Sequence, residues 1–264
     1  METARRSKLG AWCQLLRAPN LFTVPGDPIA GYVLAGGAFA GAGCAKLVAC
    51  AGASLLLYCS GLIFNDLFDL KKDRRHRPDR PLPAGKVSPV TAVLVAAVLM
   101  GGGVVLAAPA GPDALLVAGV LAAAILLYDA ATKRIPALGA VNMGLCRAMS
   151  AVLGACAAID APVLPFLGRA SAASHIGPYT LFVFVYIAIV TLFASYETTG
   201  LRLPVFGPLS PRTVQKAVGV LIRMLLVFQA AVVATAGCVG WAVAACLLAA
   251  WCVSALLARR FYAS

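Results

Sequence analysis

The sequence has very little charge for its length. Only 12% of its 264 residues are Asp, Glu, Lys or Arg, whereas 61% are hydrophobic and the mean hydropathy is +0.90. This shortage excludes a soluble globular domain, because a chain of this length cannot bury so much apolar surface. Apolar runs recur at roughly the 20 residues that a hydrocarbon core of about 30 Å requires. The composition therefore predicts a polytopic membrane protein.

The apolar runs also lack the alternation of polar and apolar residues that a membrane β-barrel needs. With a barrel excluded, helices remain as the way to satisfy backbone groups in lipid. The fold class is therefore all-α, and the helices lie close enough along the chain to form one bundle. Residues 1–264 are expected to be a single domain. Eight crossings are predicted, over 21–40, 45–65, 88–108, 113–129, 138–158, 178–196, 213–235 and 237–257.

Cysteine and histidine provide no metal or disulfide framework. The nine cysteines lie mostly within the predicted helices, and none forms a C-x-x-C pair. They are predicted to be packing residues. The two histidines, His76 and His175, are assigned no catalytic role.

Acidic residues are scarce as well, with ten Asp and Glu against 22 Lys and Arg, which gives a net charge of +12. If the N-terminus is cytoplasmic, nearly all the basic residues fall on inward segments. The exceptions are Lys46 and Arg169 outside, and Arg147 and Arg223 within predicted helices. Such an asymmetry follows the positive-inside rule. It predicts cytoplasmic termini and explains the basic balance without a nucleic-acid partner.

Residues 1–20 lack the features of a signal peptide. Gln14 and Arg17 interrupt any apolar stretch, and no small-residue cleavage site follows them. The segment is predicted to be an amphipathic helix on the inner surface of the membrane. Without a targeting segment, a bacterial inner membrane is the expected location.

Charge is concentrated in one stretch, FNDLFDLKKDRRHRPDRPLPAG, at residues 64–85. It begins at the inner end of the second predicted crossing. Spacings of three and four residues place Asp66, Asp69 and Asp73 on one side of a continuing helix. Carboxylates that share a helix face repel one another unless a cation holds them, and hard oxygen ligands suit Mg²⁺. Because Asn65 can add an amide oxygen, the stretch predicts a magnesium site.

The competing interpretation is a solvated helix end with local ion pairs. A site is favoured because Asn65 and Asp66 lie at the apolar boundary, where ionisable groups are costly. The arginines that follow, Arg77 and Arg80 among them, suit bidentate phosphate contacts. Prolines within residues 78–83 are expected to stop the helix and form a rigid loop.

The stretch resembles the first aspartate-rich motif of the UbiA superfamily of intramembrane prenyltransferases, N-D-x-x-D-x-x-x-D followed by a basic R-P-L-x-x-G loop. The segment LLRAPNLFTVPGDPIAGY resembles the start of the family's first helix. The segment LLYDAATKRIPALGAVNMGLCRAMSAVLGA resembles a family segment in which Tyr and Lys-Arg precede a helix with Asn and Arg. The positions that match the motif and loop are Asn65, Asp66, Asp69, Asp73, Arg80, Pro81, Leu82 and Gly85.

The resemblance implies transfer of a prenyl group from a prenyl diphosphate to an aromatic or other small acceptor, assisted by Mg²⁺. It implies that Asp66, Asp69 and Asp73 are catalytic metal ligands. The expected substrate-binding residues are Asn65, Arg77, Arg80, Lys133, Tyr128, Asn142, Arg147, Asn20 and Tyr196.

Some of these substrate-binding candidates have a competing structural role. Lys133 can equally be an ordinary lysine of the positive-inside pattern. Asn142 and Asn20 can equally serve as interhelical hydrogen-bonding residues. Arg147 lies within a predicted helix, where an unpaired guanidinium is costly, so it is expected to face a cavity and not lipid.

The sequence departs from the family at the second aspartate-rich motif, expected within residues 194–212. The family pattern is D-x-x-D-x-x-G-D, whereas the corresponding stretch here reads ASYETTGLR. Alignment on Gly200 leaves Glu197 as the one carboxylate, with Ala194 and Leu201 at two other positions. Glu197 is predicted to be a catalytic metal ligand that converges on the three aspartates of the first motif.

The depleted second motif keeps a non-catalytic isoprenoid-binding or scaffold protein as the alternative function. A transporter ranks third, because it does not predict carboxylates in register beside an arginine-rich loop at one membrane face. The CDP-alcohol phosphotransferases also use helical aspartates, but their D-G-x-x-A-R opening is absent.

Overall fold

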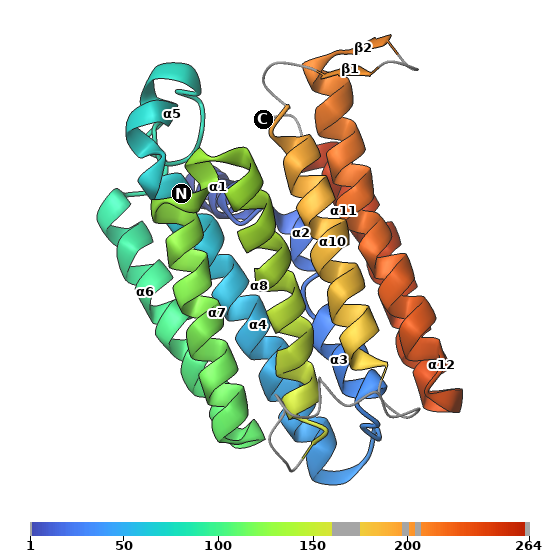
Figure 1. Ribbon diagram of the computed structural model, residues 1–264. Helices are drawn as coiled ribbons and strands as arrows, with labels where there is room; N and C mark the ends of the chain where they lie inside the picture. Colours follow the sequence, from blue (N-terminus) through green and yellow to red (C-terminus); the bar gives the residue numbers. More distant parts are fainter. Residues whose placement is uncertain (1, 160–174, 197–200, 204–206, 262–264) are drawn as a thin grey trace.

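Long helices dominate the computed structural model, which describes residues 2–159, 175–196, 201–203 and 207–261. Within these ranges, seven helices are long and apolar enough to cross a membrane. They stand side by side in one bundle (Figure 1), which confirms the all-α class. They are α4 (Gly41–Phe68), α6 (Pro89–Leu106), α7 (Pro112–Ala130), α8 (Pro136–Cys156), α10 (Ile176–Ala194), α11 (Pro211–Ala234) and α12 (Gly237–Phe261).

The ends of these helices follow from the sequence. α6, α7, α8 and α11 all begin with proline, whose fixed φ suits the first helical position and whose missing N–H is not needed there. Short elements complete the connections. They are the 3₁₀ turns η1 (Ala108–Ala110) and η2 (Thr132–Arg134), and the paired antiparallel strands β1 (Leu201–Leu203) and β2 (Gly207–Leu209).

The first predicted crossing, 21–40, is not one long helix. The chain forms α2 (Ala18–Leu21), a turn, and then α3 (Gly26–Leu34), which has nine residues. Pro25 and Pro28 interrupt the backbone hydrogen-bonding ladder at this point. At 1.5 Å per residue, α3 rises only about 14 Å, less than half of a hydrocarbon core. The prediction of eight crossings was therefore one too many for the described residues.

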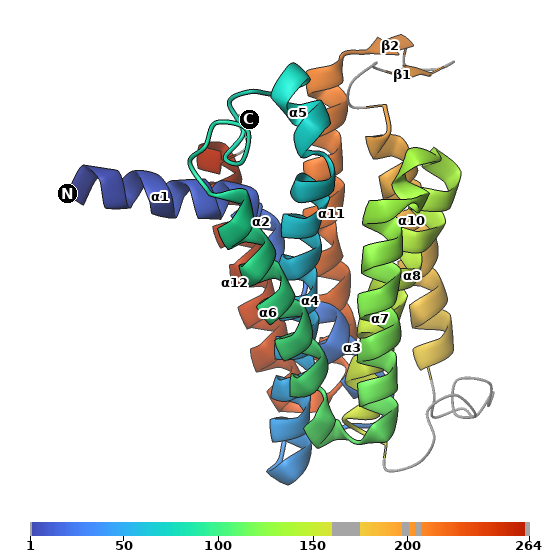
Figure 2. The ribbon, with the colours of Figure 1, turned by 90° about the vertical axis from the view of Figure 1, so that its left-hand side faces the viewer.

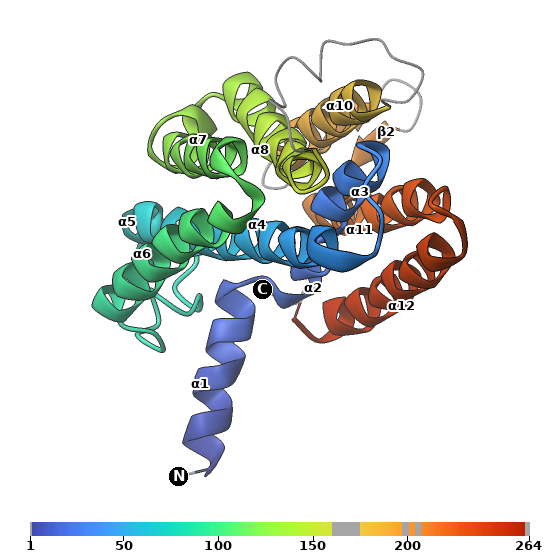
Figure 3. The same cartoon turned by 90° about the horizontal axis from the view of Figure 1, so that it is seen from below.

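α3 nevertheless lies inside the bundle. Seen from below, it is surrounded by α4, α8, α10 and α11 (Figure 3), and it contacts all four. Two glycines bring it against α8: a Cβ on Gly31 would overlap the carbonyl oxygen of Ala151, and one on Gly154 would overlap that of Pro28. Small residues allow membrane helices to approach this closely. The half-length segment is thus held by direct backbone contact with α8.

α1 (Glu2–Leu15) points away from the bundle and runs across the direction of the long helices (Figure 2). Its C-terminal end is anchored, because Ala11 and Leu15 are buried in an apolar cluster with Ile63 and Leu82. The anchor ties α1 to the same end of the bundle at which α4 ends. α1 therefore meets the bundle beside the aspartate-rich motif.

The motif forms the junction between α4 and a short helix, α5 (Leu70–His76). Asp69 lies between the two helices, and its carbonyl oxygen accepts a hydrogen bond from the backbone N–H of Asp73 at 2.8 Å. α5 ends two residues before Pro78, as expected because a proline disfavours helix in the residue before it. As predicted, the helix stops before the prolines of residues 78–83, and a loop follows.

Candidate functional site

The aspartates of the motif are each paired with a cationic side chain. Arg80 Nη1 lies 2.8 Å from Asp73 Oδ2 and 3.5 Å from Asp66 Oδ1. On the other side, Lys133 Nζ lies 3.0 Å from Asp69 Oδ2. The same lysine donates a 2.7 Å hydrogen bond to Asn65 Oδ1. The loop after α5 and the connection between α7 and α8 therefore converge on the end of α4.

The interruption of the helix at Asp69 divides the three carboxylates. Asp66 and Asp73 share Arg80 as a partner, and their side chains are only 10% and 8% exposed. The Asp69 carboxylate is 33% exposed and is paired with Lys133 instead. Two of the carboxylates therefore face the loop, and the third faces the α7–α8 connection.

The fit of this site to a metal ion can be judged from its donor atoms. Within the described ranges, no three Asp, Glu, His or Cys side chains gather closely enough to hold one. The individual donors nevertheless suit Mg²⁺, because Asp66, Asp69 and Asn65 offer hard oxygen atoms. Among the described residues, Asp66 Oδ1 is buried and accepts no hydrogen bond, although Arg80 and Arg17 lie 3.5 and 3.7 Å from it. A divalent cation that bound here would replace some of the ion pairs.

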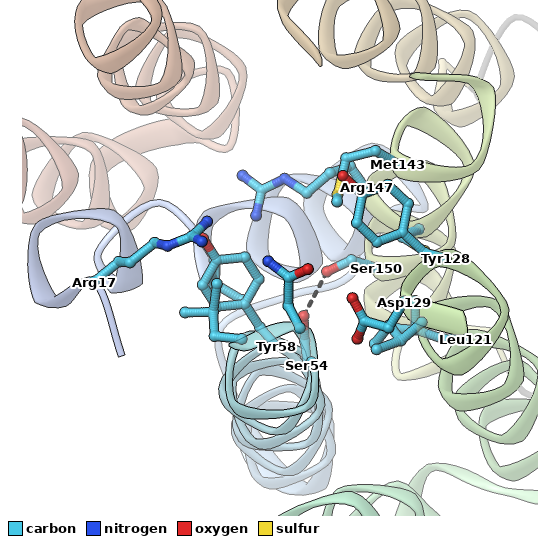
Figure 4. Close-up of a pocket in the computed structure, with 15 residues that line it drawn as sticks. Arg17, Ser54, Tyr58, Leu121, Tyr128, Asp129, Met143, Arg147 and Ser150 are labelled. Carbon is cyan, nitrogen blue, oxygen red and sulfur yellow. Dashed lines mark hydrogen bonds between the residues drawn. The ribbon is translucent and has the colours of Figure 1, made fainter. Parts of the chain in front are cut away.

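A cavity of about 100 Å³ adjoins the motif, between α4, α7, α8 and the α1–α2 junction (Figure 4). Asn65 lines the cavity and also contacts Lys133, so the cavity and the motif are contiguous. Apolar side chains such as Leu62, Leu121 and Ile125 form much of the wall. The polar lining residues are Arg17, Ser54, Tyr58, Asn65, Tyr128, Asp129, Arg147 and Ser150.

Arg17 reaches this cavity from the α1–α2 junction. Its backbone is left-handed, with φ of 46°, which is uncommon for a residue other than glycine and is often found at functional sites. Its Nη2 lies 3.7 Å from Asp66 Oδ1. Figure 4 shows its side chain directed toward the cavity from the side opposite Tyr128 and Asp129. Arg17 was not predicted as a site residue, because nothing in the local sequence shows that it meets Asp66.

Arg147 lines the cavity, as predicted. Its Nε lies 3.0 Å from Asp27 Oδ2, and its Nη2 donates to the carbonyl oxygen of Thr23 at 3.2 Å. Gln229 Nε2 donates to Asp27 Oδ1 at 2.6 Å and to the Thr23 carbonyl at 3.0 Å. Asp27 and Gln229 are fully buried. This network joins α3, α8 and α11 and fixes Arg147 in position.

The remaining asparagines have different surroundings. Asn142 Nδ2 donates to the carbonyl oxygen of Ala124 at 3.1 Å and to Thr132 Oγ1 at 3.0 Å. Its amide therefore ties α8 to α7 and η2, which favours the structural alternative. Asn20 is buried in α2, and its backbone carbonyl accepts a 2.8 Å hydrogen bond from Thr23 Oγ1.

Arg77 and Tyr196 do not line the described cavity, and Glu197 lies outside the described residues. Arg77 is exposed at the end of α5. Tyr196 follows α10 and is 39% exposed. The convergence predicted for Glu197 stays a prediction.

Asp129 is a further cavity residue that sequence analysis did not select. It lies in the last turn of α7 and is 2% exposed. The sequence did contain a signal for Asp129, because it is a carboxylate within a segment of membrane-spanning length. Ionisable residues are rare in such segments and are usually functional.

Comparison with known proteins identifies the family of this chain. The UbiA prenyltransferase family matches residues 28–263. The digeranylgeranylglyceryl phosphate synthase of Methanothrix thermoacetophila is 30% identical over 120 residues, which cover 46% of this chain and 45% of the relative. The synthase of Halobacterium salinarum is 32% identical over 163 residues, which cover 62% and 56% of the two chains. The chain thus spans about half the length of these curated relatives.

Solved structures share the fold. A structure described for digeranylgeranylglyceryl phosphate synthase in membranes has a TM-score of 0.58 at 23% identity, and the match covers 96% of this chain and 88% of that one. A UbiA homolog from Archaeoglobus fulgidus, bound to DMAPP and Mg²⁺, has a TM-score of 0.54 at 17% identity, with 94% and 87% covered. At these identities the similarity shows a common helical architecture.

Proposed function

Since the chain belongs to the UbiA prenyltransferase family, we propose that it transfers a prenyl group from an isoprenoid diphosphate to a small acceptor within the membrane. One observation carries the proposal: the aspartate-rich motif and its cationic partners adjoin a largely apolar cavity. Asn65 and Arg17 belong to both, because each lines the cavity and contacts a charged residue of the cluster. A charged head and an apolar tail of one substrate would fit this arrangement.

The diphosphate of the donor is assigned to the cationic side chains. Arg80, Lys133 and Arg17 come from three separate segments and meet at the motif. Arginine suits bidentate contacts with phosphate oxygens, and lysine adds a point charge. These contacts would orient the donor and stabilise negative charge as the diphosphate leaves.

Mg²⁺ is the proposed cofactor. The A. fulgidus homolog of the same fold is bound to Mg²⁺, and the donor atoms of Asp66, Asp69 and Asn65 suit this ion. When bound, it would supply further charge stabilisation to the leaving diphosphate. Asp73, which holds Arg80 at 2.8 Å, and Glu197 complete the proposed metal-binding set.

The apolar wall protects the reaction from water. An allylic cation, formed as the bond from C1 to the diphosphate oxygen breaks, would be captured by water in an open site. Leu62, Leu121 and Ile125 line the cavity beside the polar residues. The acceptor would then be the nearest nucleophile.

Two classes of acceptor are compatible with the sequence and the relatives. The curated relatives are named for a glyceryl phosphate product, which supports a lipid alcohol as the first candidate. An aromatic acceptor is the second. The test is to incubate purified protein with Mg²⁺, labelled geranyl, farnesyl and geranylgeranyl diphosphates, and both acceptor classes. We expect prenylated acceptor and free diphosphate. Magnesium-dependent donor binding without product from any acceptor would instead support the non-catalytic isoprenoid-binding alternative.

The protein is an integral membrane protein, and we propose that it lies in a bacterial inner membrane with both termini cytoplasmic. The distribution of Lys and Arg supports this orientation. In a cysteine-free variant, Asp79→Cys should resist a membrane-impermeant thiol reagent in intact cells. Ala42→Cys, at the other end of the bundle, should react rapidly. The opposite labelling pattern would reverse the orientation.

A further inference from the structure

The Asp129 carboxyl group faces the cavity without a hydrogen-bond partner. The residue is 2% exposed, and neither carboxylate oxygen has a donor among the described residues. Figure 4 shows the carboxyl group directed from α7 into the space that Ser54 and Ser150 also face. A buried carboxyl group in this state is costly, because its lost hydration is not replaced. The cost is expected to be offset when a ligand supplies a donor.

Three side chains with donor groups, Lys133, Ser54 and Ser150, contact other partners. Lys133 follows Asp129 by four residues, but its Nζ lies 3.0 Å from Asp69 Oδ2 and donates to Asn65 Oδ1. Ser54 and Ser150 bond to each other at 2.6 Å between their hydroxyl oxygens. These contacts therefore do not support a role for Asp129 in an internal ion pair or in interhelical hydrogen bonding. Its carboxyl oxygens can instead accept a hydrogen bond from a ligand in the cavity.

Arg17 and Asp129 approach the cavity from opposite sides (Figure 4). Because Arg17 also contacts Asp66 of the motif, its side of the cavity suits the anionic diphosphate. A carboxylate would repel a diphosphate and would equally repel an acceptor that presented a carboxylate or phosphate to it. A neutral hydroxyl group on the acceptor suits the Asp129 carboxylate, because the O–H donates a hydrogen bond and can lose a proton.

Resting on the function proposed above, we propose that Asp129 binds the acceptor through a hydroxyl group and removes its proton during transfer. The acceptor oxygen forms a bond to C1 of the prenyl group. The bond from C1 to the diphosphate oxygen breaks, and its electron pair leaves with the diphosphate. The hydroxyl proton passes to an Asp129 carboxylate oxygen, so the product is a prenyl ether. The inferred substrate class is an alcohol or phenol whose anionic groups lie away from Asp129.

The test compares Asp129→Asn and Asp129→Glu with the parent. Asp113→Asn is the matched control, because it makes the same change in the first turn of the same helix. Donor binding is measured with geranylgeranyl thiodiphosphate and Mg²⁺, and folding by the thermal unfolding midpoint. Transfer is measured with geranylgeranyl diphosphate and two hydroxyl acceptors, geranylgeranylglyceryl phosphate and 4-hydroxybenzoate, and the products are analysed by mass spectrometry.

We expect Asp129→Asn to bind the donor analogue like the parent but to transfer about 100-fold or more slowly, the usual effect of losing a general base. Asp129→Glu should recover part of the rate, and Asp113→Asn should match the parent. Unchanged ether formation in Asp129→Asn, or loss of donor binding in a folded variant, would overturn the role of Asp129 alone. A parent that binds the donor but prenylates neither hydroxyl would overturn the acceptor class, and one that does not bind the donor would remove the proposed function itself.

Discussion

Asp66→Asn is expected to lower kcat/KM for prenyl transfer by about 100- to 1,000-fold, the range seen when a group that stabilises transition-state charge is lost. This equals about 3 to 4 kcal/mol of transition-state stabilisation. The reason is position: the Asp66 side chain is only 10% exposed, and Oδ1 lies between Arg80 and Arg17 at 3.5 and 3.7 Å. Removal of its charge disrupts both the proposed Mg²⁺ ligands and the arrangement of the arginines. The measurement is steady-state release of diphosphate in Mg²⁺.

Asp79→Asn is the control for this variant, because Asp79 is exposed in the loop that follows α5. It should retain the parent's activity. Donor binding in the absence of metal should also persist in Asp66→Asn, since Arg80 and Lys133 remain. Turnover within about tenfold of the parent would show that Asp66 does not serve the leaving diphosphate.

Arg147→Met is expected to lower the free energy of unfolding by about 3 to 5 kcal/mol, the cost of leaving one charge of a buried pair without its partner. Asp27 is fully buried and lies 3.0 Å from Arg147 Nε. After the change, the hydrogen bond from Gln229 Nε2 to Asp27 Oδ1 would remain, but the opposite charge would be lost. The measurement is a denaturant titration of the purified protein in detergent micelles.

A double variant separates the charge effect from packing. Asp27→Asn combined with Arg147→Met removes both charges, so it should be more stable than Arg147→Met alone. Arg134→Met, at an exposed position in η2, is expected to change stability by less than about 0.5 kcal/mol. If Arg147→Met behaves like Arg134→Met, the network does not hold α3 in the bundle.

Hydropathy was sufficient to predict the seven long helices, because a run of about 20 apolar residues has few alternatives in a membrane. It failed at residues 21–40, where the average is still apolar. The chain there bends at Pro25 and buries Asp27, which a window average does not register. The prediction missed the break because local backbone chemistry overrides mean hydropathy.

The site was predictable to the extent that its residues are close in sequence. The spacing of Asp66, Asp69 and Asp73 indicated a site, and the arginine that pairs with two of them is in the adjoining loop. The contacts made by Arg17 and Lys133 depend on how distant segments pack, so no local pattern contains them. Asp129 was visible as a carboxylate in an apolar segment, but its lack of a partner is a property of the folded chain.

The short helix α3 affects how the protein can be assembled in the membrane. Asp27 lies in the first turn of α3, and a charged side chain at membrane depth is costly until it is paired. The partners of Asp27 are Arg147 in α8 and Gln229 in α11, and both are synthesised well after it. These contacts can form only after α8 and α11 have been made. We therefore expect α3 to be secured in the bundle later than helices that follow it in the sequence.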